Sequence, residues 1–301
     1  MKIGTSASSF CSLYGDRLAI KKLAEAGFDS IDFGYFNYPV YSKECIFSQG
    51  NKEFEAYFRA LGETAAEAGI EIGQVHSPMP SYKGQSDEED EFLYKLQERS
   101  IAAASYMNSP YIIIHPCIPE RYRYTEYRKE TKKLNMKFYR RLLPALTKYN
   151  VKLSIENMFS YDPQRKCICP TVCSTADEML DYIYTLNDGH FVACLDSGHA
   201  LLTGGTPESM ARTLGDKLET MHLHDNNGFS DEHKAPFLGI TDWDGFYKTL
   251  EDIGYKGVFS FECDGFFTMY GKKLPEESAA FLCKLGRAIT HTGETHTETK
   301  Y

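Results

Sequence analysis

Long apolar runs are missing from this sequence of 301 residues. No stretch of about 18 consecutive apolar residues occurs, and the first ten residues, MKIGTSASSF, hold no continuous apolar segment. A membrane-spanning helix needs such a stretch, and a secretory signal peptide needs a shorter one. We therefore expect a cytoplasmic protein with no membrane partner.

Positive charge is also scarce, with 33 Lys and Arg residues against 42 Asp and Glu residues and a net charge of −9. Proteins that bind nucleic acids or anionic membranes neutralise phosphate groups with Lys and Arg. The charge balance therefore argues against a nucleic-acid partner. Residues 121–141 are locally rich in Lys, Arg and Tyr, and we interpret them as a solvated helix face.

The sequence likewise shows neither the cysteine spacing of a disulfide framework nor the composition of an interdomain linker. The nine cysteines are odd in number and irregularly spaced, which indicates reduced thiols. Cys167, Cys169 and Cys173 lack a fourth partner at zinc-ribbon spacing, so we interpret them as loop packing. Without a Pro-, Gly- or Ser-rich linker, residues 1–289 are predicted to form one domain, followed by a polar tail at residues 290–301.

What the sequence does contain is an alternation of short apolar runs with longer amphipathic stretches. This alternation is typical of βα units around a parallel sheet, and eight such units predict an α/β fold of the (β/α)8 TIM-barrel type. The expected strands are residues 2–5, 30–33, 71–75, 111–114, 151–155, 191–195, 219–223 and 257–261. The main expected helices are residues 17–26, 52–68, 88–107, 126–149, 175–186, 243–253 and 275–289.

Six of the eight predicted strands end in a side chain able to bind a metal or move a proton. In a barrel of this type the C-terminal ends of the strands form one rim, which carries the active site. We therefore expect these six side chains to meet. They are His76, His115, Glu156, Asp196, His222 and Glu262.

Glu156, Asp196, His222 and Glu262 together offer three carboxylates and one imidazole. Such a mixture suits one divalent metal, Mn, Co, Mg or an open Zn site, rather than a closed structural zinc site. We therefore predict these four residues as metal ligands at a catalytic rim.

A second ring of candidates consists of His76, His115, His199, Asp231 and His233. Imidazole can serve as donor, base or ligand, so these side chains either bind further metals or hold substrate hydroxyls beside a single metal. We expect the substrate-binding role. His224 follows His222 by two residues and receives no role at this point.

Four motifs carry a family resemblance: IENM, CLDSGHA, HLHDN with the later DEH, and FSFE. They resemble those of the xylose-isomerase-like TIM-barrel superfamily, whose members include sugar isomerases and epimerases, inosose dehydratase-like proteins and endonuclease IV. The resemblance runs over residues 2–289, approximately the whole predicted barrel.

For the ketose 3-epimerase branch, the resemblance implies that Glu156, Asp196, His222 and Glu262 hold a single metal. It further implies that Glu156 and Glu262 are the catalytic acid/base pair on opposite faces of the sugar, and that His199 contacts substrate hydroxyls. The chemistry of these side chains agrees with this implication. A metal that holds a carbonyl and an adjacent hydroxyl lowers the free energy of an enediolate intermediate, and a carboxylate can move the proton.

The resemblance also supports a competing function. Nine residues are similar to the trinuclear-zinc ligands of endonuclease IV, which implies a zinc phosphodiesterase. They are His76, His115, Glu156, Asp196, His199, His222, Asp231, His233 and Glu262. A dehydratase or C-glycoside-cleaving lyase on the same metal site and a non-enzymatic sugar-binding barrel are further alternatives.

We favour a metal-dependent isomerase or epimerase that moves a proton next to a carbonyl through an enediolate-type intermediate. Its substrate would be a small carbohydrate: a sugar, sugar acid, sugar phosphate or cyclitol. The acidic balance decides against the nuclease, since DNA enzymes gain affinity from many phosphate contacts. The sequence leaves open whether the chain forms a homo-oligomer.

Overall fold

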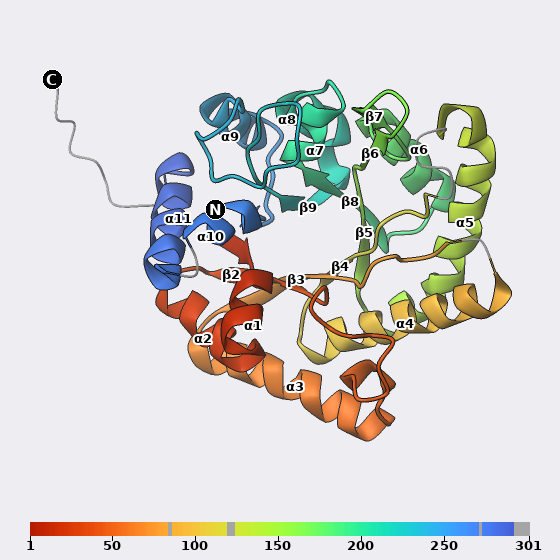
Figure 1. Ribbon diagram of the computed structural model, residues 1–301, viewed down its shortest axis with the longest axis horizontal. Helices are drawn as coiled ribbons and strands as arrows, with labels where there is room; N and C mark the ends of the chain where they lie inside the picture. Colours follow the sequence, from red (N-terminus) through yellow and green to blue (C-terminus); the bar gives the residue numbers. More distant parts are fainter. Residues whose placement is uncertain (84–85, 119–123, 271–272, 292–301) are drawn as a thin grey trace, which may run out of the picture.

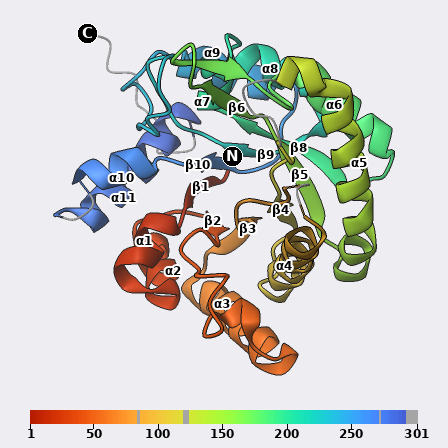
Figure 2. The same ribbon diagram turned by 45° about the vertical axis from the view of Figure 1, so that its right-hand side comes forward.

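Eight parallel strands form the centre of the computed structural model, which describes residues 1–83, 86–118, 124–270 and 273–291 (Figures 1 and 2). They follow one another in the sheet in the order β10-β1-β2-β3-β4-β5-β8-β9. The circle closes at Leu223, next to β9, which bridges to Phe261 of β10. The strands are β1 (Ile3–Ser6), β2 (Ser30–Gly34), β3 (Glu71–His76), β4 (Tyr111–Ile113), β5 (Lys152–Glu156), β8 (Phe191–Asp196), β9 (Leu218–His222) and β10 (Phe259–Phe261).

Helices surround the strands on the outside and form the second layer of the barrel (Figure 2). None of the described helices is long and apolar enough to cross a membrane. They are α1 (Ser8–Tyr14), α2 (Asp16–Glu25), α3 (Asn51–Ala68), α4 (Asp87–Tyr106), α5 (Tyr124–Tyr149), α6 (Ala176–Leu186), α7 (Ser197–Leu202), α8 (Pro207–Leu214), α9 (Trp243–Asp252), α10 (Asp264–Tyr270) and α11 (Pro275–Ile289), with short 3₁₀ turns at Ile46–Ser48 and Gly215–Lys217.

Helix α3 shows how the sequence specifies this layer. Its buried residues Phe54, Phe58, Leu61 and Ala65 recur at helical spacing and give the helix one apolar face toward the sheet. Gly69 ends the helix in a left-handed conformation, φ 73°, and its N–H donates to the Ala65 carbonyl. Local sequence therefore fixes both the orientation of the helix and its last turn.

Helix α4 begins as the acidic run 87–91 predicts. The Ser86 side chain accepts a hydrogen bond from the Glu89 N–H, and four acidic residues fill the first turn. Both features favour a helix N-terminus, because the capping oxygen satisfies a free N–H and the negative charges complement the helix dipole.

The predicted barrel is confirmed, and every predicted strand lies within two residues of the observed one. Several short elements were missed: helices α1, α7 and α10, and the two strands of an antiparallel pair, β6 (Phe159–Asp162) and β7 (Cys167–Pro170). These segments have seven residues or fewer, too short for periodicity to indicate their structure. The cysteine-bearing loop therefore includes a hairpin, in which Cys167 pairs with Asp162 and Cys169 with Ser160.

The predicted tail at residues 290–301 lies outside the described residues from position 292 onward. Its first residue, Thr290, is buried and forms the C-cap of α11. The end of the last helix therefore belongs to the packed barrel.

Candidate active site

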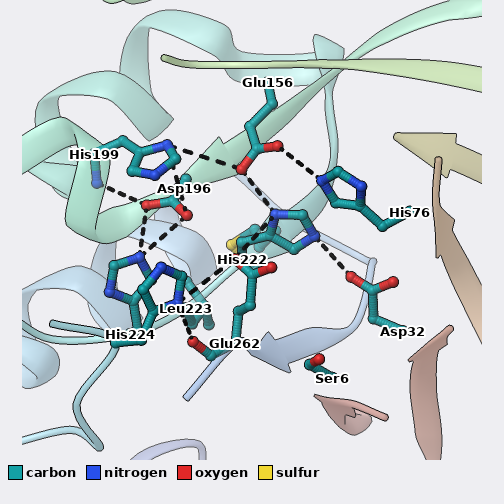
Figure 3. Close-up of polar contacts among 12 residues, drawn as sticks. Ser6, Asp32, His76, Glu156, Asp196, His199, His222, Leu223, His224 and Glu262 are labelled. Carbon is teal, nitrogen blue, oxygen red and sulfur yellow. Dashed lines mark hydrogen bonds and ion pairs between the residues drawn. The ribbon is translucent and has the colours of Figure 1, made fainter. Parts of the chain in front are cut away.

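The four predicted metal ligands meet at one rim of the barrel (Figure 3). Glu156, Asp196 and His222 are the last residues of β5, β8 and β9, and Glu262 follows β10. One ligand atom from each of the four lies within 4.8 Å of the others, and all four side chains are buried. Because these strands are parallel and share an edge, residues far apart in sequence converge there.

His222 lies at the centre of this cluster. Its Nδ1 is 2.8 Å from Glu156 Oε1 and 3.6 Å from Glu262 Oε2. Burial would lower the pKa of His222, but the groups around it, with Cys194, Glu262 and Glu156 foremost, hold this pKa well above its ordinary value. The imidazole therefore occupies a strongly negative environment that a cation could also occupy.

The two glutamates differ in their surroundings. Burial would raise the pKa of Glu156, but His222 and His115 outweigh it and hold this pKa well below its usual range. Burial raises the pKa of Glu262, and its Oε2 is 3.6 Å from His222 and 3.9 Å from His233, too far for strong hydrogen bonds. Two carboxyls whose pKa values are pushed in opposite directions are typical of acid/base pairs.

His76 and His115 lie beside Glu156, and the ring of His76 also stacks on that of His222 with the centroids 5.4 Å apart. His115 Nε2 is 2.7 Å from Glu156 Oε2 and 2.9 Å from His76 Nε2. Burial lowers the pKa of His115 to about 4, so this ring is neutral near pH 7. The ring of Phe36 lies against His76, with the ring centroids 4.4 Å apart.

His199, Asp231 and His233 form a second cluster, joined by His224. Asp231 Oδ2 is 3.1 Å from His233 Nε2 and 3.9 Å from His199 Nε2. The His233 ring stacks on His224 with centroids 4.0 Å apart, and its backbone takes the left-handed conformation at φ 45°. The side chains of Asp231 and His233 are 25% and 24% exposed, so this cluster is the more open part of the rim.

Charge in this second cluster predicts a pH dependence for the metal-free protein. Despite burial, Asp196 and Asp231 raise the pKa of His199 to about 10, and Asp231 also raises the pKa of His233 to about 10. A histidine whose pKa is raised by folding contributes stability below its unfolded pKa and loses it as the pH rises through the folded value. We expect the free energy of unfolding to fall by roughly 1–3 kcal/mol between pH 6.5 and 10 for this reason.

Urea unfolding in the presence of a chelator measures this loss. Asp231→Asn should flatten the pH profile, whereas Asp216→Asn, which removes an exposed carboxylate, should not. Parallel profiles for the wild type and Asp231→Asn would contradict the assignment.

Asn157 and Asp196 hold each other in place across β5 and β8. The Asn157 side chain donates to the Asp196 carbonyl at 2.9 Å and accepts from the Asp196 N–H at 2.7 Å. The Asp196 side chain caps α7 by accepting from the His199 N–H at 2.7 Å, and the Asn157 carbonyl accepts from His199 Nδ1 at 2.8 Å. The sequences EN and DSGH therefore build one rigid corner of the site.

Gly198 in this corner has no room for a side chain. A Cβ atom at Gly198 would lie 1.9 Å from Cε1 of His224. We expect Gly198→Ala to displace the His224 ring and to destabilise the protein by about 1–3 kcal/mol, since overpacking of a filled site costs that much. Denaturant unfolding measures the change, and Gly189→Ala, whose Cβ meets nothing within 4 Å, is the control. Equal stability of the two variants would refute this packing argument.

Asp225 anchors the loop that carries Asp231 and His233. Its buried carboxylate accepts from the N–H of Gly239, the N–H and hydroxyl of Thr241, and Nε1 of Trp243, at 2.9 to 3.1 Å. A Cβ at Gly239 would lie 2.2 Å from the Asn226 carbonyl oxygen, so glycine is needed for this close approach. The second cluster therefore rests on a fixed loop.

Sequence reasoning missed two members of the site. His224 is fully buried, with Nε2 at 3.1 Å from Asp196, and its position two residues after His222 was the available signal. Asp32 of β2 is buried and lies 2.7 Å from His222 Nε2. An acidic residue in an otherwise uncharged strand, SIDFG, was its only signal.

Comparison with known proteins places this geometry in a family. A family model described as xylose isomerase-like TIM barrel matches residues 20–285. The chain belongs to this family. The expected resemblance is thereby confirmed for nearly the whole barrel.

The chain is also similar to sequence relatives and to solved structures. An uncharacterized protein of Methanocaldococcus jannaschii, MJ1311, is 26% identical over 166 residues, and the match spans only about half of each protein, 54% of this chain and 54% of the relative. The crystal structure of a D-tagatose 3-epimerase-like protein has a TM-score of 0.70 at 22% identity and covers 95% of this chain and 100% of its own. The crystal structure of IOLI protein with a bound zinc atom has a TM-score of 0.73 at 19% identity and covers 98% and 100%. At these identities the two structures establish the shared fold.

Proposed function

We propose that this protein is a divalent-metal-dependent isomerase or epimerase that moves a proton next to the carbonyl of a small carbohydrate. The substrate class is a sugar, sugar acid, sugar phosphate or cyclitol. The observation that carries the proposal is the buried convergence of Glu156, Asp196, His222 and Glu262 at the C-terminal rim. The names of the structural neighbours support it, since one is described as D-tagatose 3-epimerase-like and another contains zinc.

The donor set fits one divalent metal. Three carboxylates and one imidazole provide the oxygen and nitrogen ligands that Mn, Co, Mg or open Zn sites use. Such a cluster of buried carboxylates is costly without a cation, because a buried charge needs a partner. When bound, the metal supplies Lewis acidity that makes a carbon next to a carbonyl more acidic.

Glu156 and Glu262 are the proposed acid/base pair. Glu262 is the better base for the first proton transfer, because its pKa is raised by burial and its histidine contacts are longer than hydrogen bonds. Glu156 is 2.8 Å from His222 and 2.7 Å from His115, so its position is fixed on the other side of the cluster. A proton taken from one face of a carbon by one carboxyl and returned to the opposite face of that carbon by the other gives inversion there. A proton returned instead to the adjacent carbon gives aldose–ketose isomerisation.

The second ring is proposed to bind the substrate hydroxyls. His115, Asp231 and His233 have side chains 13%, 25% and 24% exposed, whereas those of His76 and His199 are 2% and 9% exposed. The more exposed three are therefore the first contacts for hydroxyl groups. His76 and His199 are the more buried members of the ring, and the centroid of the Phe159 ring lies 4.8 Å from that of His199.

Hydrogen–deuterium exchange at carbon tests the proposal. The metal-loaded protein is incubated in D₂O with a panel of ketoses, aldoses, sugar acids, sugar phosphates and keto-cyclitols, and ¹H NMR records which C–H signal disappears. Exchange next to a carbonyl is expected with at least one class. The absence of exchange with every class, in protein shown to hold its metal, would reject the isomerase and epimerase assignment.

A zinc phosphodiesterase is a second candidate, favoured by a specific observation. Three groups of potential ligands lie side by side: His76, Glu156 and His222; Glu156, Asp196, His222 and Glu262; and His199, His224, Asp231 and His233. Three clustered metals would suit phosphodiester cleavage. Elemental analysis decides, because close to one metal per chain supports carbohydrate chemistry and close to three zincs supports the phosphodiesterase. A dehydratase or C-glycoside lyase would begin with the same proton transfer as the isomerase. Its reaction products would distinguish it from an isomerase or epimerase.

A further inference from the structure

Asp32 is next to the ligand cluster. Among the described residues of that cluster it contacts His222. It belongs to β2 and is 3% exposed. Its Oδ2 accepts a hydrogen bond from His222 Nε2 at 2.7 Å, while His222 Nδ1 faces Glu156 and Glu262 (Figure 3). The two nitrogens of this ring therefore have different partners, with the carboxylate of Asp32 on the side away from the proposed metal.

Gln74 fixes Asp32 in turn. Gln74 of β3 is buried, and its Nε2 donates to Asp32 Oδ2 at 2.9 Å and to the carbonyl of Met221 at 3.2 Å. Met221 precedes His222 on β9, and β2 and β9 are separated in the sheet by β1 and β10. The Asp32–Gln74 pair thus connects opposite sides of the barrel at the base of His222.

A buried carboxylate is expensive unless it is paired and hydrogen-bonded. Asp32 Oδ1 has no hydrogen-bond partner among the described residues, so this carboxylate is only partly satisfied. An apolar side chain would fill an interior strand position at lower cost. The arrangement is therefore poorly explained by stability alone and well explained by a role toward His222.

We propose that Asp32 is a positioning residue for His222. By accepting from Nε2 it fixes the orientation of the imidazole and reserves Nδ1 for the metal. The inference rests on the proposed function, since it assigns a role within that metal site. Carboxylates that hold the second nitrogen of a metal-binding histidine typically contribute 10- to 100-fold to metal affinity.

Asp32→Asn tests the role, with Glu219→Gln as the matched control. Glu219 lies at the other end of β9, where it accepts from Tyr111 at 2.8 Å and from Lys152 at 2.6 Å. Both variants remove one carboxylate charge from the barrel, but only Asp32→Asn changes the partner of His222. Three quantities are compared: the Co²⁺ dissociation constant by chelator competition, the visible absorption spectrum of the Co²⁺ form, and the melting temperature of the metal-free protein.

For Asp32→Asn we expect Co²⁺ affinity about 10-fold or more below that of the wild type and a changed Co²⁺ spectrum. Its metal-free melting temperature should fall no further than that of Glu219→Gln, which should bind Co²⁺ as the wild type does. Wild-type affinity and spectrum in Asp32→Asn would overturn the inference, and so would an equal loss of affinity in both variants. Failure of the wild type itself to bind Co²⁺ would instead overturn the proposed function. Should Asp32→Asn not fold, Asp32→Ser is measured against the same expectations.

Discussion

Replacement of Glu262 by Gln is expected to lower turnover by about 10²- to 10⁴-fold while the barrel stays folded. Glutamine keeps the size of the side chain but can neither take nor release a proton. Burial raises the pKa of Glu262, and its Oε2 lies 3.6 Å from the His222 nitrogen at the centre of the ligand cluster. The substitution therefore removes the proposed base and one of four metal ligands at once, so metal affinity should fall as well.

Exchange of C–H for deuterium under single-turnover conditions, at saturating metal, separates these two losses. Glu232→Gln is the matched control, because Glu232 lies in the neighbouring loop and forms a partly exposed ion pair with Lys234. The control should react like the wild type. Full activity of Glu262→Gln at limiting as well as at saturating metal would contradict the mechanism, whereas activity lost at limiting metal and recovered at saturation would leave Glu262 as a ligand only.

Removal of the metal is expected to abolish turnover and to lower the free energy of unfolding by about 4 kcal/mol, relative to protein in metal at 1,000 times its dissociation constant. The metal would bind the folded cluster and not the unfolded chain, in which the four ligands are separated by up to 106 positions, from Glu156 to Glu262. Urea unfolding with chelator and with added Mn²⁺ or Co²⁺ measures the difference. Re-addition of the metal should restore activity.

Asp196→Asn provides the internal control for metal removal. Asparagine can still accept the hydrogen bond from the His199 N–H that caps α7, but it no longer offers a charged ligand. The stability of this variant should respond much less to the chelator. The proposed function would be contradicted if elemental analysis showed the wild type to be free of metal and its turnover were still undiminished.

The barrel itself could be predicted because each βα unit carries its own signal. Helix α11 was predicted at residues 275–289, and these are its observed bounds, because a proline at its first position and a regular apolar face mark the helix. The ligand cluster could be predicted because strand ends share a rim. Both inferences depend only on local patterns combined with the geometry of a closed parallel sheet.

Contacts across the barrel could not be predicted in the same way. Asp32 and His222 are 190 positions apart, and nothing in either local pattern indicates that their side chains meet. The hairpin β6–β7 was interpreted as a loop because its strands have four residues each. Side-chain orientation inside the barrel depends on sheet register, and register shifts occur between Ile31 and Asp32 and between Ala193 and Cys194. Such irregularities carry no reliable signature in one sequence.

The joint between β9 and β10 has a consequence for the dynamics of the site. Leu223 and Phe261 form one bridge there, with backbone hydrogen bonds from Leu223 N–H to the Ser260 carbonyl and from Glu262 N–H to the Leu223 carbonyl. His222 and Glu262 flank this joint, so an ion held by both would cross-link the first and last strands of the sheet order. Amide exchange at Leu223 and Glu262 should therefore slow on metal binding more than exchange at the well-paired β5–β8 ladder. A bound ion would then reinforce the closure of the barrel at this joint.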